Sequence, residues 1–172
     1  QKDYKEYEKE IAKKRAEYEK MIEEGFKDAA KFPFEPLYAM KELERAMPEN
    51  SILVVDPGIS AVYPAGFIKM KKAGRNFICN FAQGSLGYAT AAAMGAAKAR
   101  PDCTIVHITG DGSFGFCAGE YETLARNNDN VKVILINNHS FGWIRVSNSM
   151  AFENEPFATE FSDIDYVTIM KG

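Results

Sequence analysis

The chain has 172 residues, a length that is sufficient for one domain with a buried core. Its formal net charge is only −3 at pH 7, so the composition does not indicate a nucleic-acid partner. No apolar run is long enough to cross a bilayer, and the charged amino end lacks the pattern of a signal peptide, so we expect a soluble, non-secreted protein.

Three cysteines are scattered along the chain without a C-x-x-C pair. An odd and dispersed set is typical of a reducing, intracellular compartment, and it argues against an iron–sulfur cluster. We therefore expect the protein to be cytoplasmic, with Cys79 and Cys103 as small residues of the core.

The first segment, residues 2–27, is dense in Lys, Arg and Glu. Its apolar residues, Tyr4, Tyr7, Ile11, Tyr18 and Met21, recur at spacings of three and four, with Lys14 filling the gap between Ile11 and Tyr18. This spacing predicts a helix with one apolar stripe. A linker helix on the domain surface is the favoured interpretation, and a coiled-coil or partner-docking helix is the alternative. We place this charged helical leader at residues 1–34 and a single domain at 35–172.

Helices and short apolar runs alternate after the leader. The pattern predicts helices at 37–47 and 89–99 and strands at 51–56 and 76–80. Strands that alternate with helices imply right-handed crossovers. The predicted fold class is therefore α/β, with a doubly wound parallel sheet flanked by helices.

Two polar residues in these strands have competing interpretations. Asp56 ends the first strand, so it either faces a cavity at the sheet edge or serves a turn or a helix cap. Its neighbours Pro57 and Gly58 favour the turn or cap role. His107 lies in the middle of a later apolar run and is expected to be an interior histidine with hydrogen-bond partners.

Two further apolar runs, 103–109 and 131–136, enclose a predicted helix at 118–127. Both runs are short and rich in β-branched residues, which is typical of strands buried on both faces of a parallel sheet. Loops that follow such strands meet at the carboxyl edge of the sheet, where open α/β folds bind ligands. Asp111 and Asn138, which are 27 positions apart, lie in these loops and are expected to be close in space.

The string at 110–115, G-D-G-S-F-G, matches the dinucleotide-binding fingerprint literally. That site requires an acidic residue at the end of the second strand, where this chain carries Asn137 and Asn138. The carboxylate of Asp111 would also repel a pyrophosphate unless a cation lay between them. Asp111 and Asn138 offer oxygen ligands of the kind that Mg²⁺ takes beside substrate phosphates. A metal-bridged diphosphate is therefore the better interpretation.

The combined string carries a resemblance to a known family. Gly110-Asp111-Gly112, followed after 24 residues by Asn137-Asn138, resembles the signature of thiamine-diphosphate-dependent enzymes. The chain beyond the leader is most similar to the diphosphate-binding domain of the acetolactate synthase, pyruvate oxidase and 2-oxoacid decarboxylase superfamily. The resemblance implies thiamine diphosphate and Mg²⁺ as cofactors.

The resemblance also implies a role for individual residues. Asp111, the side chain of Asn138 and the main-chain oxygen of Ser140 would bind Mg²⁺. The diphosphate would be held by backbone amides and glycines, at Gly110, Gly112, Ser113, Gly142, Trp143 and Ile144. The sequence from Phe141 onward predicts the start of a helix, and helix amino ends bind anions.

A second matching stretch opens the Ala-rich helix predicted at 89–99. Leu86 lies 25 residues before Asp111. In the family, an apolar residue at this position wedges under the cofactor and bends it, which brings the aminopyrimidine nitrogen close to the reactive thiazolium carbon. The carbonyl of Gly84 would accept a hydrogen bond from the aminopyrimidine.

The resemblance implies an enzyme that acts on a 2-oxoacid by acetolactate-synthase-like decarboxylation and acyl transfer, as a transferase or lyase. In the family, a glutamate on a separate pyrimidine-binding domain activates the cofactor, and no stretch of this chain resembles that domain. The catalytic residue of this chain is therefore unknown. We expect the site to be completed by another part of the same enzyme or by a partner subunit, within a homo-oligomer such as a dimer, and this chain alone to be inactive.

The ends of the chain suggest a piece of a longer polypeptide. It begins with Gln1 rather than Met, and its last segment, 165–172, is predicted to be a helix where the family's fold would continue into another strand. We therefore expect a domain truncated at its carboxyl end. A subunit of a split 2-oxoacid decarboxylase and a non-catalytic metal-phosphate binding module are the alternatives.

Overall fold

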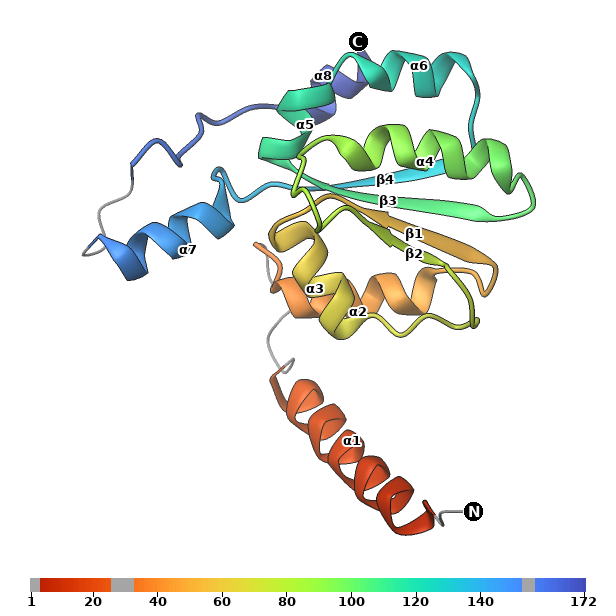
Figure 1. The fold of residues 1–172 in the computed structure, drawn as a ribbon. Helices are drawn as coiled ribbons and strands as arrows, with labels where there is room; N and C mark the ends of the chain where they lie inside the picture. The colour runs from red at the N-terminus through yellow and green to blue at the C-terminus, as the bar shows by residue number, and fades with distance from the viewer. Residues whose placement is uncertain (1–3, 26–32, 153–156) are drawn as a thin grey trace. The chain divides into compact units, whose positions relative to one another are not determined.

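The computed structural model describes residues 4–25, 33–152 and 157–172 (Figure 1). The contacts divide the chain into two compact units, Gln1–Ala46 and Met47–Gly172. The first unit contains α1 (Lys5–Gly25) and α2 (Pro36–Ala46), which confirms the two helices predicted from the spacing of apolar residues. No helix in the described part of the chain combines the length and the apolarity needed to span a membrane.

Ion pairs between residues four apart run along the polar faces of α1. Lys14 pairs with Glu10 at 3.2 Å, and Lys20 pairs with Glu24 at 3.8 Å. Each exposed pair of this kind adds only about 0.3–0.5 kcal/mol to helix stability. The charged residues therefore favour the helix but do not explain its apolar stripe.

The second unit is built on a parallel sheet of four strands in the order β2-β1-β3-β4 (Figure 1). The strands are β1 (Ser51–Val55), β2 (Phe77–Cys79), β3 (Thr104–Gly110) and β4 (Val131–Ile136). Val55 pairs with Ile108, and Gly110 pairs with Ile136. All four strands therefore end at one edge of the sheet, as the alternation of strands and helices predicted.

Helices cover both faces of this sheet (Figure 1). The helices of this unit are α3 (Ile59–Phe67), α4 (Tyr88–Ala99), α5 (Asp111–Cys117), α6 (Glu120–Arg126), α7 (Gly142–Ala151) and α8 (Tyr166–Lys171). In Figure 1, α3 lies on one face and α4 with α6 on the other, while α7 lies beyond the carboxyl end of β4. The predicted doubly wound α/β fold is thereby confirmed.

The core lies between α4 and the two central strands. Ala89 and Ala93 of α4 pack with Val54 and Ile105, and all four are completely buried. Alanines on this face of α4 allow the helix backbone to approach the β-branched surface of the sheet closely. Burial of each large aliphatic side chain here contributes about 1.5–3 kcal/mol.

Two expectations need correction. β4 is only partly buried, because it lies at an edge of the sheet and has one neighbouring strand, so the expected burial on both faces holds for β3 alone. Asp111 does not lie in an open loop, since it is the first residue of α5, a helix that the periodicity did not predict. The predicted helix at 118–127 corresponds to α6.

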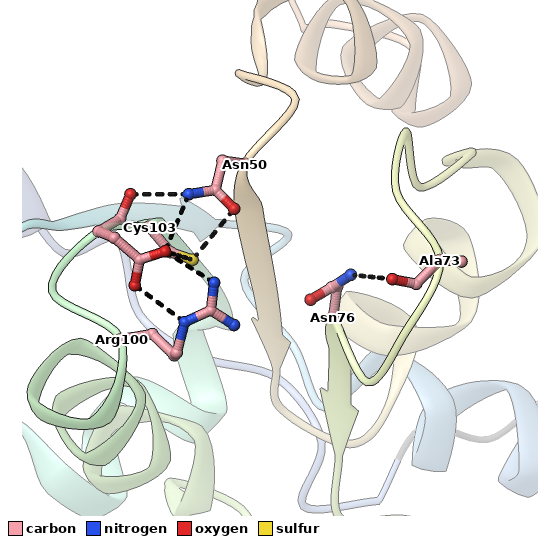
Figure 2. A network of polar contacts seen from close by, with 6 residues as sticks. Asn50, Ala73, Asn76, Arg100 and Cys103 are labelled. Carbon is pink, nitrogen blue, oxygen red and sulfur yellow. Dashed lines mark hydrogen bonds and ion pairs between the residues drawn. The ribbon is translucent and has the colours of Figure 1, made fainter.

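A separate polar network joins the strands at their amino ends (Figure 2). The side-chain amide of Asn50 donates to the main-chain oxygen of Asp102 at 2.8 Å, and the Cys103 thiol donates to Asn50 Oδ1 at 3.3 Å. Arg100 donates to both carboxylate oxygens of Asp102, at 2.9 and 2.8 Å, which holds the pKa of that carboxyl well below its usual range. These groups satisfy one another.

Candidate functional site

A cavity of about 410 Å³ opens at the carboxyl edge of the sheet. Its lining comes from the segments that follow each of the four strands, namely 57–62, 81–86, 110–113 and 136–144. Every residue that the sequence assigned to the metal or to the cofactor lies in this lining. The four segments meet there because all four strands are parallel and end at the same edge.

Asp111 links the end of β3 to the segment that follows β4, the two strands from which the metal site was predicted. Its side chain is 4% exposed. One carboxylate oxygen accepts the Gly112 N–H at 2.8 Å, and the other accepts the Asn138 N–H at 3.2 Å. An ionised carboxylate has further lone pairs beyond these two bonds, so it remains a possible ligand for a cation.

Asn138 and Ser140 follow β4 on the same side of the cavity. The side chain of Asn137 accepts the N–H of His139, which has a left-handed φ of 55° and turns the chain between them. The main-chain oxygen of Ser140 accepts the Gly142 N–H at 2.9 Å and keeps a second lone pair. The cavity therefore offers oxygens of three kinds: carboxylate, amide and carbonyl.

This donor set differs from a cluster of ionisable ligands. In the described part of the chain, no group of three or more His, Cys, Asp or Glu side chains is arranged to hold a metal. Mg²⁺ usually binds one or two carboxylates and completes its shell with water and substrate phosphates. A single carboxylate with two neutral oxygens is a suitable partial shell for that ion.

Two glycines allow close packing in the cavity wall, Gly112 against the residue before α7 and Gly142 against Asn138 and α3. A Cβ atom on Gly112 would lie 2.5 Å from Cε1 of Phe141. A Cβ atom on Gly142 would lie 2.6 Å from Nδ2 of Asn138 and 2.5 Å from Cδ1 of Ile59. Any larger residue at either position would displace a group in the cavity wall.

The amino end of α7 faces the cavity. The helix begins at Gly142, as predicted, and the Arg145 N–H makes the first bond back along it, to the Phe141 oxygen at 2.9 Å. The amides of Trp143 and Ile144 precede that bond, and the two residues line the cavity with half-exposed side chains. A helix start of this kind presents N–H groups and a partial positive charge to an anion.

The segment before α4 supplies a different part of the wall. Gly84 and Gly87 have left-handed φ values of 62° and 83°, which glycine adopts without strain. The turn between them presents Leu86, which is half-buried and lines the cavity. Leu86 therefore offers an apolar surface between this turn and the Asp111 side of the cavity.

Polar residues behind the cavity have internal roles. Asp56 does not line the cavity, and its carboxylate accepts the Ala89 N–H in the first turn of α4, which confirms the cap interpretation. His107 is completely buried, with Nε2 3.2 Å from Thr90 Oγ1 and 3.3 Å from the Tyr121 hydroxyl, as expected of an interior histidine. Burial lowers the pKa of His107 and raises the pKa of Tyr121 to about 12.

Sequence reasoning missed part of the lining. Ile59 and Val62 of α3 and Phe81 after β2 contribute apolar surface to the cavity. The rule that identified Asp111 also applies to the ends of β1 and β2. The rule therefore gives the region in which these residues lie, but it does not single them out.

Comparisons with known proteins agree with this geometry. The family model "Thiamine pyrophosphate enzyme, C-terminal TPP binding domain" matches residues 56–172. The large subunit of acetolactate synthase isozyme 2 from Escherichia coli (strain K12) is 31% identical over 134 residues, which are 76% of this chain and 24% of that protein. The 2-hydroxyacyl-CoA lyase 2 of Homo sapiens is 30% identical over 135 residues, covering 76% of this chain and 21% of that protein.

A solved structure shares the fold. The thiamine diphosphate-dependent 4-hydroxybenzoylformate decarboxylase of Rhodococcus jostii RHA1 matches with a TM-score of 0.73 and 22% identity, over 80% of this chain and 26% of that one. The chain spans about a quarter of the length of the relatives described here. The match to residues 56–172 covers more than half of the chain, and it includes the whole predicted site. The chain therefore belongs to the thiamine pyrophosphate enzymes, through their C-terminal TPP-binding domain.

Proposed function

We propose that this chain is the diphosphate- and Mg²⁺-binding part of a thiamine-diphosphate-dependent enzyme that acts on a 2-oxoacid, with acetolactate-synthase-like decarboxylation and acyl transfer. The observation that carries the proposal is the Asp111 carboxylate, which lines the cavity at the strand ends and accepts the main-chain N–H of Asn138 at 3.2 Å. An oxygen-rich, partial coordination shell beside a helix amino end suits a metal-bridged diphosphate.

The metal is assigned to three ligands of this chain. Asp111 supplies the charge, and the side chain of Asn138 and the main-chain oxygen of Ser140 supply neutral oxygens. All three residues line one cavity, which supports the assignment. Asp111 is held by two backbone amides, so its oxygens are oriented before any ion binds.

The diphosphate is assigned to the glycines and amides on both sides of that carboxylate. Gly110, Gly112 and Ser113 lie on the β3 side, and Gly142 with the amides of Trp143 and Ile144 lies on the α7 side. The close approach of the two sides, which the glycines permit, supports this assignment. The Gly142 N–H already donates to the Ser140 oxygen, so on this side we assign the anion mainly to the main-chain N–H groups of Trp143 and Ile144.

The cofactor rings are assigned to the turn before α4. Leu86 presents an apolar side chain to the cavity, and Gly84 provides a main-chain oxygen to the aminopyrimidine. When bound, thiamine diphosphate supplies an electron sink for the carbon from which carbon dioxide departs. This chain's contribution is to bind and orient the cofactor and to exclude water from one of its faces.

The proton transfer that starts the reaction is assigned to a group outside this chain. We infer a glutamate on a pyrimidine-binding domain, either of the same enzyme or of a partner subunit in a homo-oligomer. The coverage of no more than about a quarter of the relatives' length is consistent with that division. We also propose a cytoplasmic setting, which the odd and dispersed set of three cysteines supports.

The reaction type is the finer part of the proposal. An acetolactate synthase and a 2-hydroxyacyl-CoA lyase match this chain at almost the same identity. Transferase and lyase chemistry both require the same metal and diphosphate half of the site. Product analysis with pyruvate, in the presence of the complementary domain, distinguishes acetolactate formation from simple decarboxylation or cleavage.

Replacement of Asp111 tests the proposal. We expect Asp111→Ala to weaken Mg²⁺-dependent binding of thiamine diphosphate by about 100-fold or more, because it removes the one charged ligand assigned to the ion, and even groups that only orient metal ligands commonly account for about 10–100-fold in metal affinity. The measurement is a calorimetric titration with Mg²⁺ present and with Mg²⁺ removed by a chelator. The Asp163→Ala variant removes an exposed carboxylate that does not line the cavity and serves as the control.

Thermal unfolding must accompany the titration. Asp111 is buried and accepts two amides, so its removal leaves those amides unpaired and is expected to cost about 1–3 kcal/mol of stability. A folded Asp111→Ala protein that binds the cofactor as tightly as the unaltered protein contradicts the proposed metal site.

A further inference from the structure

Asp56 is an acidic residue that is completely buried behind the cavity. Its side chain is 0% exposed, and it follows directly after β1. A carboxylate buried so completely is unfavourable unless strong hydrogen bonds replace its contacts with water. Those hydrogen bonds identify the segments that depend on Asp56.

The first bond reaches the turn that carries Leu86. Asp56 Oδ1 accepts the N–H of Ala89, the second residue of α4, at 3.1 Å. The N-cap residue of α4 is Gly87, which has no side chain to cap the helix. Asp56 therefore supplies from β1 the acceptor and the negative charge that helix amino ends favour.

The second bond reaches the segment that carries Asp111. Asp56 Oδ2 accepts the hydroxyl of Thr109 at 2.9 Å, and Thr109 directly precedes Gly110 and Asp111. The Asp56 N–H also donates to the Ile108 oxygen at 3.0 Å, which extends the pairing of β1 with β3 beyond the strand. One side chain thus holds two of the segments that line the cavity.

The third contact involves the main chain of Asp56. Its carbonyl oxygen accepts the hydroxyl of Ser60 at 3.0 Å, and Ser60 is a buried residue of α3 that lines the cavity. The segments after β1, β2 and β3 are therefore tied to one residue that does not itself line the cavity.

We propose that Asp56 is a positioning residue whose carboxylate fixes the distance between the Gly84–Gly87 turn and the Gly110–Asp111 segment. The inference rests on the proposed function, in which these two segments hold opposite ends of one thiamine diphosphate molecule. A rigid cofactor tolerates little change in that distance, because a displacement of about 1 Å in a reacting group can lower the rate about 100-fold.

Three variants separate positioning from simple stability. Asp56→Ala removes both carboxylate bonds. Asp56→Asn keeps an oxygen for the Ala89 N–H and gains an amide that donates to the Thr109 hydroxyl, whose own proton can turn to the Gly110 oxygen 3.3 Å away. Asn50→Ala is the control, because it removes hydrogen bonds between the same two strands at their amino ends.

The first measurement is the affinity for thiamine diphosphate in the assembled enzyme, with Mg²⁺ present. We expect a loss of about tenfold or more for Asp56→Ala, recovery to within about threefold for Asp56→Asn, and a change below about twofold for Asn50→Ala. The inference would be overturned if the loss of affinity followed the loss of thermal stability in the same proportion for Asp56→Ala and for Asn50→Ala.

The second measurement is amide hydrogen exchange without cofactor. We expect Asp56→Ala to speed exchange in residues 84–90 and in residues 109–113 together, and Asn50→Ala to speed neither. If Asp56→Ala does not fold, the near-isosteric Thr109→Val variant removes one bond and should speed exchange in both segments. Unchanged exchange in either segment refutes the positioning role. Failure of the unaltered enzyme to bind thiamine diphosphate refutes the proposed function. In that case hydrogen exchange still tests whether Asp56 holds the two segments in place.

Discussion

The two ends of the parallel sheet use polar residues in opposite ways. At the amino ends, Asn50, Arg100, Asp102 and Cys103 bond to one another and form a closed network (Figure 2). At the carboxyl ends, Asp111 takes two amides but still borders a cavity of about 410 Å³. Polar groups that satisfy one another stabilise the fold, and polar groups with remaining capacity can bind a ligand.

The cause of the difference is the direction of the strands and the helices. Each strand of a βαβ unit leads at its carboxyl end into the amino end of a helix, so amides and helix dipoles gather at that edge. The opposite edge receives helix carboxyl ends and tight turns, such as the one from Ala99 through Arg100 to Cys103. The fold therefore places helix amino ends, which favour anions, at the carboxyl edge of the sheet.

The largest expected effect concerns activity at the carboxyl edge. We expect this chain alone to show no measurable 2-oxoacid decarboxylation, and addition of the glutamate-bearing domain to restore it. Loss of a proton-transfer group commonly lowers a rate by about 10²–10⁴-fold, and here the opposing wall of the pocket would be missing as well. Pyruvate consumption with saturating cofactor and Mg²⁺ measures this. Robust turnover by the isolated chain would show that the catalytic group lies within it.

The close packing around the start of α7 can be tested with a methyl group. We expect Gly142→Ala to weaken cofactor binding about tenfold, because its Cβ would lie 2.6 Å from Nδ2 of Asn138 and must displace that proposed ligand. Gly95→Ala is the matched control, since a Cβ there meets nothing within 4 Å in the helix interior. That control should bind normally and gain about 0.5–1 kcal/mol of stability. Equal binding by both variants would contradict the assigned wall.

His107 lies between the two edges and should make stability depend on pH. Burial lowers its pKa in the folded state, so the unfolded chain binds more protons between the usual value near 6.5 and the lowered one. The contribution of the neutral, buried His107 to the free energy of unfolding is present above about pH 6.5. It is lost as the pH falls through that window, by up to about 1.4 kcal/mol per pH unit. Urea unfolding from pH 7 to 5 measures it, and His107→Gln should flatten the slope. An unchanged slope in that variant would assign the dependence to other groups.

The smallest effect is expected at the amino edge. Asn50→Ala should lower stability by about 1 kcal/mol, the usual net value of a lost hydrogen bond, and should leave cofactor affinity unchanged. Chemical denaturation and calorimetry on the same preparation test both parts. If Asn50→Ala weakened cofactor binding as much as Gly142→Ala, the proposed difference between the structural amino edge and the ligand-binding carboxyl edge would be wrong.

The periodicity of the sequence was sufficient to predict the strands, most helices and the part of the cavity wall that follows β3 and β4. Short runs of β-branched residues are typical of buried strands, and a longer Ala-rich segment is typical of a helix, so the local sequence identified both kinds of element. Parallel strands have a defined carboxyl edge, so Asp111 and Asn138 could be placed together before the fold was known. The resemblance added the Gly84 turn and Leu86, which no periodicity singles out.

Tertiary structure decided what local patterns cannot encode. The partial burial of β4 depends on which strands lie beside it. Asp111, the first residue of α5, accepts the main-chain N–H of Asn138, which is 27 positions away along the chain. The role of Asp56 was the least predictable detail. Its adjacency to Pro57 and Gly58 indicated a local cap, whereas its partners Ala89 and Thr109 are 33 and 53 positions away along the chain. Sequence spacing determines which residues share an element, and only packing brings such distant groups within hydrogen-bonding distance.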